Sequence, residues 1–321
     1  MVNIDEIDNL ILKQISATYI SGENLATELN VSRTAVWKRI QKLKELGYEI
    51  ESSKRGYKLK KKTELLLPIE IFHCLKTSYI GKNYIFFKEI DSTNDYAKRC
   101  KELEDGTVVL AETQTSGKGR KGRQWLSTEG KGIYLSIVLQ PKIPINEILK
   151  FSLIFPLAVK EAVEKNINQE VCIKWPNDLY LNGNKFAGIL MESEIEANEI
   201  SRIIVGIGIN VNNDFSDFND LKNIATSLKM ETGEEIDRKK LLCDLLETIE
   251  IKYAEYFVKK SEIIDKINGS LLWRNQKVKI IDGNHQIEGE LIKVDETGGL
   301  VLKTERGTQI VYSGDVSLRK V

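Results

Sequence analysis

The first sixty residues carry three helical patterns of apolar positions, followed by two short alternating stretches. The spacing predicts a helix over about 4–16, a second helix that Ser21 caps and a third that Ser32 caps. Polar and apolar residues then alternate over 48–51 and 56–59, which is typical of a two-stranded hairpin. Helix-turn-helix geometry followed by a hairpin predicts a winged helix.

From about residue 65, helical and strand patterns are mixed without regular alternation. Helical patterns lie at 68–76, 92–101, 147–165 and 238–259, and strand patterns at 84–87, 107–111, 133–139, 171–174, 186–192 and 202–211. Because helices and strands do not alternate as in a doubly wound fold, we expect a mixed or antiparallel sheet with flanking helices.

The last fifty residues show strand patterns between glycine-containing turns, at 278–281, 287–294, 300–303 and 308–312. They predict a small β-barrel. The chain is therefore expected to be an α+β protein with three domains, at residues 1–62, 65–270 and 271–321.

Composition places the chain among ordinary soluble proteins, with 29% charged and 41% hydrophobic residues in 321. No apolar run approaches the length of a membrane span, and the start lacks the pattern of a secretory signal. A cytoplasmic protein without a membrane partner is expected. The cysteines, Cys74, Cys100, Cys172 and Cys243, are far apart and include no C-x-x-C pair, so we expect reduced core thiols.

Charge is balanced overall but distributed unevenly: residues 30–62 carry 11 Lys and Arg against 3 Asp and Glu. Such an excess favours contact with a polyanion. The third predicted helix and the hairpin turn supply the candidate DNA-binding residues, which are Ser32, Arg33, Thr34, Trp37, Lys38, Gln41, Lys54 and Arg55. A helical protein-interaction module with solvated charges is the alternative.

Residues 116–125, Ser-Gly-Lys-Gly-Arg-Lys-Gly-Arg-Gln-Trp, place three glycines among four cations. Glycines let the backbone approach a ligand, and the cations neutralise phosphate or carboxylate, so a nucleotide is a natural candidate. The spacing matches G-x-G-x-x-G, but strand patterns lie on both sides, whereas a Rossmann turn opens a helix. A P-loop is excluded because Arg123 and Gln124 follow the last glycine. A solvated basic hairpin remains the simpler alternative.

Two further motifs suit a polar or phosphorylated ligand. Asp91-Ser92-Thr93-Asn94 is an N-cap sequence whose hydroxyls and amide also suit a polar heterocycle. Lys174-Trp175-Pro176-Asn177-Asp178 offers groups for phosphate and Mg²⁺, although an exposed turn would also explain it.

Two glycine-containing strands and a polar loop follow. Lys185 precedes Gly188, where a strand glycine admits close approach. In Val205–Asn210 the alternation places two glycines on one face, which suggests that something lies flat against it. The loop Asn212–Asp220 could fold over a ligand or be a mobile surface loop.

Together these segments resemble the family of bifunctional biotin-protein ligases and biotin operon repressors. The resemblance is carried in family order by Ser92–Asn94, Glu112–Gln114, the Gly117–Arg123 loop with Trp125, Lys174–Leu179, Lys185–Leu190 and Gly206–Asn210. The flanking helix-turn-helix and small barrel match as well, so it covers essentially the whole chain. It implies a central domain related to class II aminoacyl-tRNA synthetases and a C-terminal SH3-like barrel.

The resemblance implies two half-reactions. Biotin and MgATP form biotinyl-5'-adenylate, and a lysine of the biotin carboxyl carrier protein of acetyl-CoA carboxylase then accepts the biotinyl group. The residues implied to bind biotin are Ser92, Thr93, Asn94, Gln114, Lys118, Gly119, Arg120, Lys185 and Gly188. Those implied to bind the nucleotide are Arg123, Trp125, Lys174, Asn177 and Asn210. Arg120, Lys185 and Asp178 are implied to be catalytic, with Asp178 near Mg²⁺.

Lys118 stands where the family usually has Arg, which keeps the charge and loses the bidentate fork. The resemblance further implies that the adenylate acts as corepressor, promoting a homodimer that binds operator DNA. The alternatives are a lipoate-type ligase, a non-catalytic biotin-sensing DNA-binding regulator, and a ligase whose winged domain no longer represses.

Overall fold

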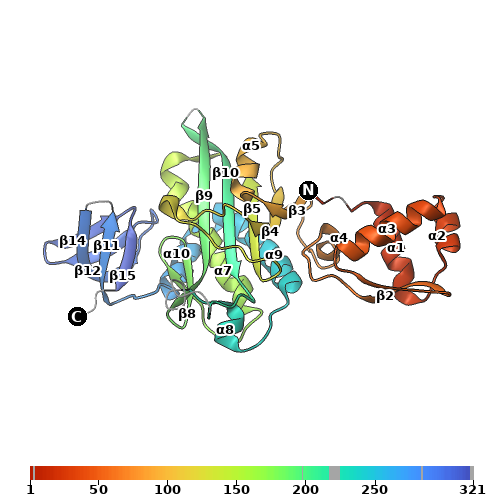
Figure 1. Cartoon of the computed structure of the whole chain (residues 1–321). Coiled ribbons are helices and arrows are strands. Elements are labelled where there is room, and N and C mark those ends of the chain that lie inside the picture. Colours follow the sequence, from red (N-terminus) through yellow and green to blue (C-terminus); the bar gives the residue numbers. More distant parts are fainter. Residues whose placement is uncertain (3, 197, 217–224, 283–284, 319–321) are drawn as a thin grey trace. The chain divides into compact units, whose positions relative to one another are not determined.

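The computed structural model describes residues 1–2, 4–196, 198–216, 225–282 and 285–318. They form two compact units, Met1–His73 and Cys74–Val321 (Figure 1). The boundary between the units follows a short helix, α4 (Pro68–Ile71).

The first unit is a winged helix-turn-helix, as predicted. Its elements are α1 (Glu6–Ala17), α2 (Gly22–Glu28), α3 (Arg33–Glu45) and the antiparallel hairpin of β1 (Glu49–Ser53) and β2 (Gly56–Lys61). The Ser21 side chain accepts a hydrogen bond from the backbone N–H of Asn24, and Ser32 accepts one from Ala35. Both predicted N-caps are therefore confirmed.

Part of the basic excess in this unit is neutralised internally. Arg39 and Lys42 turn from α3 towards α1 and lie 2.7 and 2.6 Å from the carboxylate oxygens of buried Asp8. Burial lowers the pKa of Arg39, but hydrogen bonds to Asp8 and Asp5 outweigh it, so the net shift is upward. These two cations therefore bind α3 to α1.

The second unit is built on an eight-stranded mixed sheet, which confirms the predicted sheet type. Its order is β3 (Tyr84–Ile90), β4 (Val108–Gln114), β5 (Gly132–Leu139), β10 (Glu199–Asn210), β9 (Asn184–Glu196), β8 (Asp178–Leu181) and β7 (Cys172–Lys174), and β6 (Ile143–Pro144) pairs with β10. β3 and β4 are parallel, and the other ladders are antiparallel.

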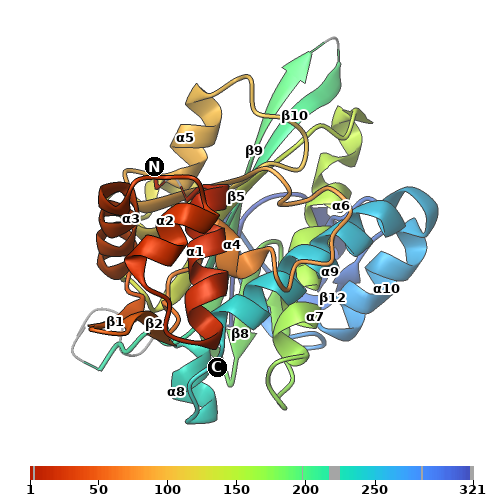
Figure 2. The same ribbon diagram turned by 90° about the vertical axis from the view of Figure 1, so that its right-hand side faces the viewer.

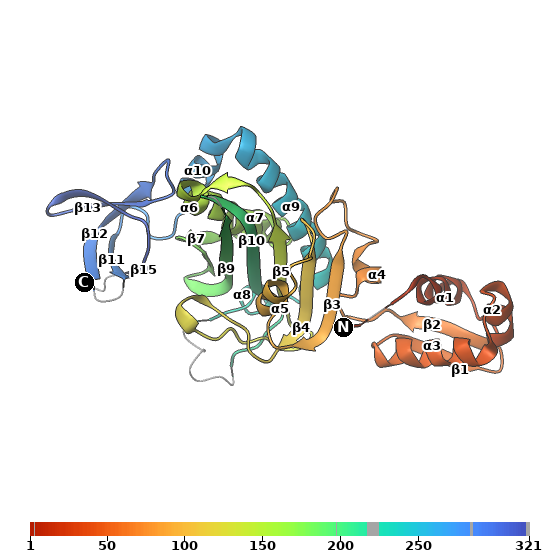
Figure 3. The same ribbon diagram turned by 90° about the horizontal axis from the view of Figure 1, so that it is seen from above.

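Helices cover both faces of this sheet (Figures 2 and 3). α7 (Ile154–Glu164) and α9 (Arg238–Val258) pack together on one face, with α10 (Lys260–Gly269) beside them. α5 (Thr93–Arg99) packs on the other face, where Ala97 joins a buried cluster with Phe87, Val109, Val138 and Ile204. This packing fixes the N-terminus of α5 over the middle of the sheet.

The C-terminal segment adds a five-stranded antiparallel sheet. Its order is β14 (Gly307–Val311), β13 (Leu300–Thr304), β12 (His285–Val294), β11 (Lys277–Asp282) and β15 (Asp315–Leu318). Trp175 Nε1 donates to the carbonyl oxygen of Gly298 at 2.9 Å, and Asn268 exchanges two hydrogen bonds with the backbone of Val294. The small sheet is thus fastened to the central part of the unit.

Several short elements escaped the sequence analysis. The helix predicted at 68–76 is only α4, and the one at 147–165 divides into η2 (Ile145–Glu147), α6 (Ile148–Ser152) and α7. The unpredicted elements are β6, β8, α8 (Leu228–Thr232), α10, β15 and the 3-10 turn η1 (Arg120–Gly122). Apart from α10, which has ten residues, these elements are too short for periodicity to reveal them.

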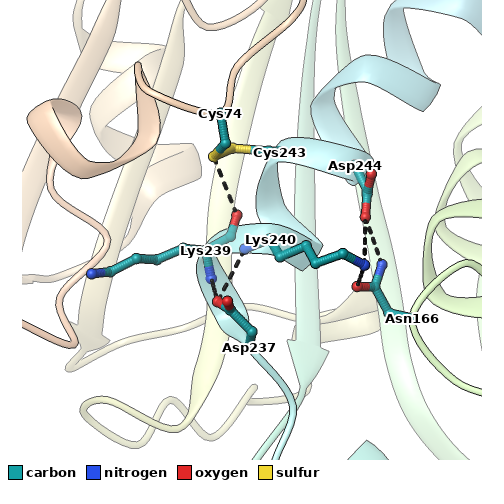
Figure 4. The surroundings of a disulfide bond; sticks show 7 residues. All are labelled: Cys74, Asn166, Asp237, Lys239, Lys240, Cys243 and Asp244. Atoms are coloured by element: carbon teal, nitrogen blue, oxygen red, sulfur yellow. Dashed lines mark hydrogen bonds and ion pairs between the residues drawn. A yellow bond between two sulfur atoms is a disulfide. The ribbon is translucent and has the colours of Figure 1, made fainter.

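The expectation of four reduced cysteines is wrong for two of them. Cys74 and Cys243 form a disulfide with their Cα atoms 6.0 Å apart, whereas Cys100 and Cys172 are free (Figure 4). The paired residues are separated by 169 positions, so only the fold brings them together. Spacing along the chain gave no signal of this pair.

A buried ion pair joins the sheet to the start of α9. Arg238 Nη1 lies 2.9 Å from Glu112 Oε2, with 5% and 0% of the two side chains exposed. Arg238 also donates to the carbonyl oxygen of Gly132, the first residue of β5. One guanidinium group therefore connects α9, β4 and β5.

We expect Arg238→Met to lower the free energy of unfolding by about 3–5 kcal/mol, because it removes the cation beside a buried carboxylate. Urea unfolding monitored by far-UV circular dichroism measures this loss. The neighbouring Lys240→Met removes a surface ion pair with Asp244 and an exposed hydrogen bond to Asn166, and should cost at most about 1 kcal/mol. Equal losses in both variants would contradict a special role for the buried pair.

Candidate functional site

A cleft of about 880 Å³ lies between the N-terminus of α5, the 116–127 loop and strands β9 and β10. Every residue that the resemblance implied in biotin binding, nucleotide binding or catalysis lines it: Ser92, Thr93, Asn94, Gln114, Lys118, Gly119, Arg120, Arg123, Trp125, Lys174, Asn177, Asp178, Lys185, Gly188 and Asn210. Segments distant in sequence therefore meet in one place.

One part of the cleft is a network of buried hydroxyl and amide groups. Gln114 Oε1 accepts hydrogen bonds from the backbone N–H and the hydroxyl of Thr93, at 2.9 and 3.1 Å. Gln114 Nε2 donates to Ser127 Oγ at 3.1 Å. These bonds fix the orientation of the Gln114 amide.

Asn94 is held in the same network. Its Oδ1 lies 2.5 Å from Ser136 Oγ, and its Nδ2 donates to Glu192 Oε2 at 2.9 Å. Ser136 Oγ also lies 2.7 Å from Thr93 Oγ1. The network presents alternating donors and acceptors, which suits a small polar ring with both N–H and C=O groups.

The other part of the cleft is cationic, and each cation has an acceptor on the protein. Lys185 Nζ lies 2.7 Å from Asp178 Oδ1, and Arg120 Nη1 donates to Asn177 Oδ1 at 2.8 Å. Lys118 lies 2.7 Å from Asp95, and this hydrogen bond raises the pKa of Lys118. The three cations are therefore held in position by acceptors on the protein.

Glycines make room for the protein's own side chains on the cleft floor. A Cβ atom on Gly208 would lie 2.5 Å from Trp125 Cε2, and one on Gly206 would lie 2.3 Å from Asn94 Oδ1. A Cβ on Gly188 would approach Trp125 at 3.1 Å. The groups that lie against the glycine face, as the alternation suggested, are thus the Trp125 indole and the Asn94 amide of the protein itself.

Trp125 also contacts a cation. The Nζ atom of Lys185 lies 5.5 Å from the centroid of the Trp125 ring, within the range of a cation–π interaction. The indole Nε1 is buried and has no hydrogen-bond partner within the described part of the chain. Trp125 therefore joins the sheet, the basic loop and Lys185.

The sequence analysis missed three residues that hold the polar network in place, Ser127, Ser136 and Glu192. Ser136 interrupts the apolar run 133–139, and that signal could have identified it. Ser127 and Glu192 gave no such signal, because their place depends on loop path and strand register. Of the loop Asn212–Asp220, Phe215 lines the cleft, and residues 217–220 lie outside the described residues.

The first unit contains a second candidate site, a groove of about 700 Å³ between α3 and the β1–β2 hairpin. Arg33, Thr34, Trp37 and Lys54 line it. Arg33 and Lys54 form no ion pair with any residue that the structure describes, and Trp37 is 53% exposed. A groove with uncompensated cations and an exposed indole suits a nucleic acid.

The other DNA-binding candidates lie around this groove rather than in its lining. Ser32 caps α3, Lys38 is exposed on the same helix and Gln41 is half-buried. The Arg55 guanidinium lies 4.8 Å above the Tyr19 ring.

No group of three or more His, Cys, Asp or Glu side chains that could hold a metal ion occurs among the described residues, and Asp178 is paired with Lys185. No helix in the described ranges is long and apolar enough to cross a membrane.

Fold and sites together define a protein that combines a DNA-binding winged helix with a domain for a small ligand and an anionic co-substrate. Residues 86–210 match the model of the biotin/lipoate A/B protein ligase family, residues 9–58 match an HTH domain, and residues 275–319 match the biotin protein ligase C-terminal domain.

Curated relatives agree over nearly the full length. The bifunctional ligase/repressor BirA of Bacillus subtilis is 37% identical over 96% of both chains, and that of Escherichia coli is 31% identical over 97% of this chain and 96% of its own. The chain belongs to the biotin protein ligase family and is similar throughout to its bifunctional ligase/repressors. The Aquifex aeolicus biotin protein ligase, solved with biotin and ATP, is 36% identical, with a TM-score of 0.66 over 75% of this chain and 100% of that chain.

We expect Gly208→Ala to displace Trp125 and to lower the free energy of unfolding by about 1–3 kcal/mol, because the added methyl group overpacks the indole. Tryptophan fluorescence during denaturation reports both effects. Gly269→Ala is the matched control: its Cβ meets nothing within 4 Å, and a change beyond about 0.5 kcal/mol is not expected. An unshifted emission spectrum in Gly208→Ala would contradict the packing argument.

Proposed function

We propose that the chain is an ATP-dependent biotin-protein ligase and a repressor of biotin operon transcription. Biotin and MgATP would form biotinyl-5'-adenylate and pyrophosphate, and a lysine of the biotin carboxyl carrier protein of acetyl-CoA carboxylase would then accept biotin as an amide. The observation that carries the proposal is the meeting of the polar network and the cation cluster in one cleft.

The polar network is suited to the ureido ring of biotin, which offers two N–H donors and a carbonyl acceptor. Thr93, Asn94 and Gln114 would exchange hydrogen bonds with it, and Ser92, the N-cap of α5, lines the same end. Ser127, Ser136 and Glu192 already hold these side chains in place. Biotin binding would therefore lose little side-chain entropy.

The cation cluster would act on the reacting groups. Lys185 and Arg120 would offset the negative charges of the biotin carboxylate and the α-phosphate, which repel one another as the carboxylate attacks. On ligand binding, Lys185 would leave Asp178 and contact the ligand, and Arg120 would leave Asn177 in the same way. Lys118, Gly119 and Gly188 would contact biotin, and the lack of a side chain at Gly188 leaves room for Trp125 and Lys185.

The nucleotide would occupy the remaining part of the cleft, against Arg123, Trp125, Lys174, Asn177 and Asn210. A single carboxylate such as Asp178 fits Mg²⁺, which is commonly held by one or two carboxylates together with substrate phosphates. Mg²⁺ would neutralise charge on the phosphates. Enclosure by the basic loop would protect the reactive anhydride from water until the carrier lysine arrives.

The winged helix would read an operator in the groove between α3 and the hairpin. We further propose that the adenylate is the corepressor, that it favours a DNA-binding homodimer, and that the protein acts in the cytoplasm.

The test is biotin-dependent pyrophosphate release from MgATP by the purified protein, followed by addition of a biotin carboxyl carrier domain. Release and labelling of one carrier lysine are expected. Pyrophosphate release with lipoate but not with biotin would identify a lipoate ligase. No pyrophosphate release with either acid would identify a non-catalytic sensor.

We expect Lys185→Gln to slow adenylate formation by about 100–1000-fold, because a charge that stabilises the transition state is lost. Single-turnover formation of biotinyl-5'-adenylate measures this step. Lys229→Gln, which removes an exposed lysine paired with Glu235, is the control and should retain the full rate. A normal rate in Lys185→Gln would remove Lys185 from the proposed machinery.

Arg33→Ala and Lys54→Ala should each weaken operator binding and reduce the slope of log K against log [salt] by about 1, because each removes a phosphate contact. Fluorescence anisotropy with labelled operator over a salt series measures both quantities in the presence of biotin and MgATP. Lys13→Ala, an exposed lysine on α1, is the control. Unchanged slopes in the first two variants would place the DNA elsewhere.

A further inference from the structure

The start of the second unit is fastened to α9 at two points. At the first point, Cys74 is bonded to Cys243 of α9. At the second, the carboxylate of Glu250 accepts hydrogen bonds from the backbone N–H groups of Ser78, Tyr79 and Ile80, at 2.6, 3.0 and 2.9 Å. Cys243 and Glu250 are seven residues apart, which places them two turns apart on the same face of the helix.

The two fasteners differ in chemistry. Burial opposes ionisation of Glu250, but the backbone donors outweigh it and lower the pKa of this carboxyl, so the second fastener is present at neutral pH. The first depends on the oxidation state of its two sulfur atoms. Only one of the two fasteners therefore responds to the thiol–disulfide balance of the surroundings.

The environment of the disulfide permits both oxidation states. Cys74 is partly exposed, so a thiol can approach it, whereas Cys243 is buried at 6% exposure. The Cys74 sulfur lies 3.9 Å from the carbonyl oxygen of Lys239, to which a reduced thiol can donate a weak hydrogen bond.

We propose that Cys74 and Cys243 are a redox modification site, a clasp that closes by exchange with a small-molecule disulfide and opens with thiols. On closing, the Cys74 thiolate attacks one sulfur of glutathione disulfide and releases one glutathione thiolate. The Cys243 thiolate then attacks the Cys74 sulfur of the mixed disulfide and releases the second. Two protein thiols lose two electrons and two protons, and one glutathione disulfide becomes two glutathione molecules.

The clasp determines the first residue at which the chain that follows the winged helix is attached to α9. When it is closed, the chain is held at Cys74. When it is open, the next fastener is at Ser78. The three intervening residues span four Cα–Cα steps and add at most roughly 14 Å of chain that can open locally. Lys76 lies exposed within this stretch and offers a cleavage site for trypsin. This inference does not depend on ligase activity.

The test compares full-length protein equilibrated with glutathione disulfide and with reduced glutathione. Alkylation after acid quench and denaturation, read by mass spectrometry, should count two thiols in the first sample, from Cys100 and Cys172, and four in the second. After removal of thiols under nitrogen, trypsin should cut after Lys76 at least tenfold faster in the reduced protein. Cleavage after exposed Lys60 is the internal reference and should not change.

Matched variants separate the clasp from general effects. Cys74→Ser should be cut after Lys76 at the fast rate under both conditions, and Cys172→Ser should keep the full redox difference. Glu250→Gln should speed cleavage of the reduced form without changing the thiol counts. Four reactive thiols after treatment with glutathione disulfide, or equal cleavage rates after Lys76 in the two forms, would overturn the proposal.

Discussion

The active cleft depends on one steric constraint, the absence of side chains at Gly188, Gly206 and Gly208. Without Cβ atoms there, the Trp125 indole and the Asn94 amide pack directly against the backbone of β9 and β10. Trp125 anchors the basic loop over the sheet, and Asn94 anchors the N-terminus of α5. The cations of the basic loop and the polar groups of α5 therefore meet above the same two strands. Glycine serves here to admit side chains of the protein itself.

The same rule relates the role of a cation to its partner in both units. Cations that hold the fold together are paired with carboxylates, as Arg39 is with Asp8 and Arg238 with Glu112. Cations of the cleft are held by exchangeable acceptors, as Lys185 is by Asp178. An exposed or half-exposed ion pair costs little to exchange for a ligand, whereas a buried one costs several kcal/mol to break. Burial thus separates structural from functional cations.

α9 connects the parts of the second unit. Its first residue, Arg238, holds β4 and β5, and the segment just before it is tied to the end of β10, where Asn212 exchanges hydrogen bonds with the backbone of Ile236. Further along, Cys243 and Glu250 hold the chain that arrives from the winged helix. A single helix therefore connects the central strands to the segment that follows the winged helix.

Local patterns in the sequence determined the winged helix, the mixed sheet and the motifs that line the cleft, because caps, alternation and glycine-rich loops are encoded by neighbouring residues. The tertiary structure alone decided which long-range partners meet. Ser136 and Glu192 reach Asn94 through strand register, Trp125 fills the glycine face through the path of its loop, and Cys74 meets Cys243 across 169 positions. No local spacing records such contacts, since they arise only when distant segments are packed against one another.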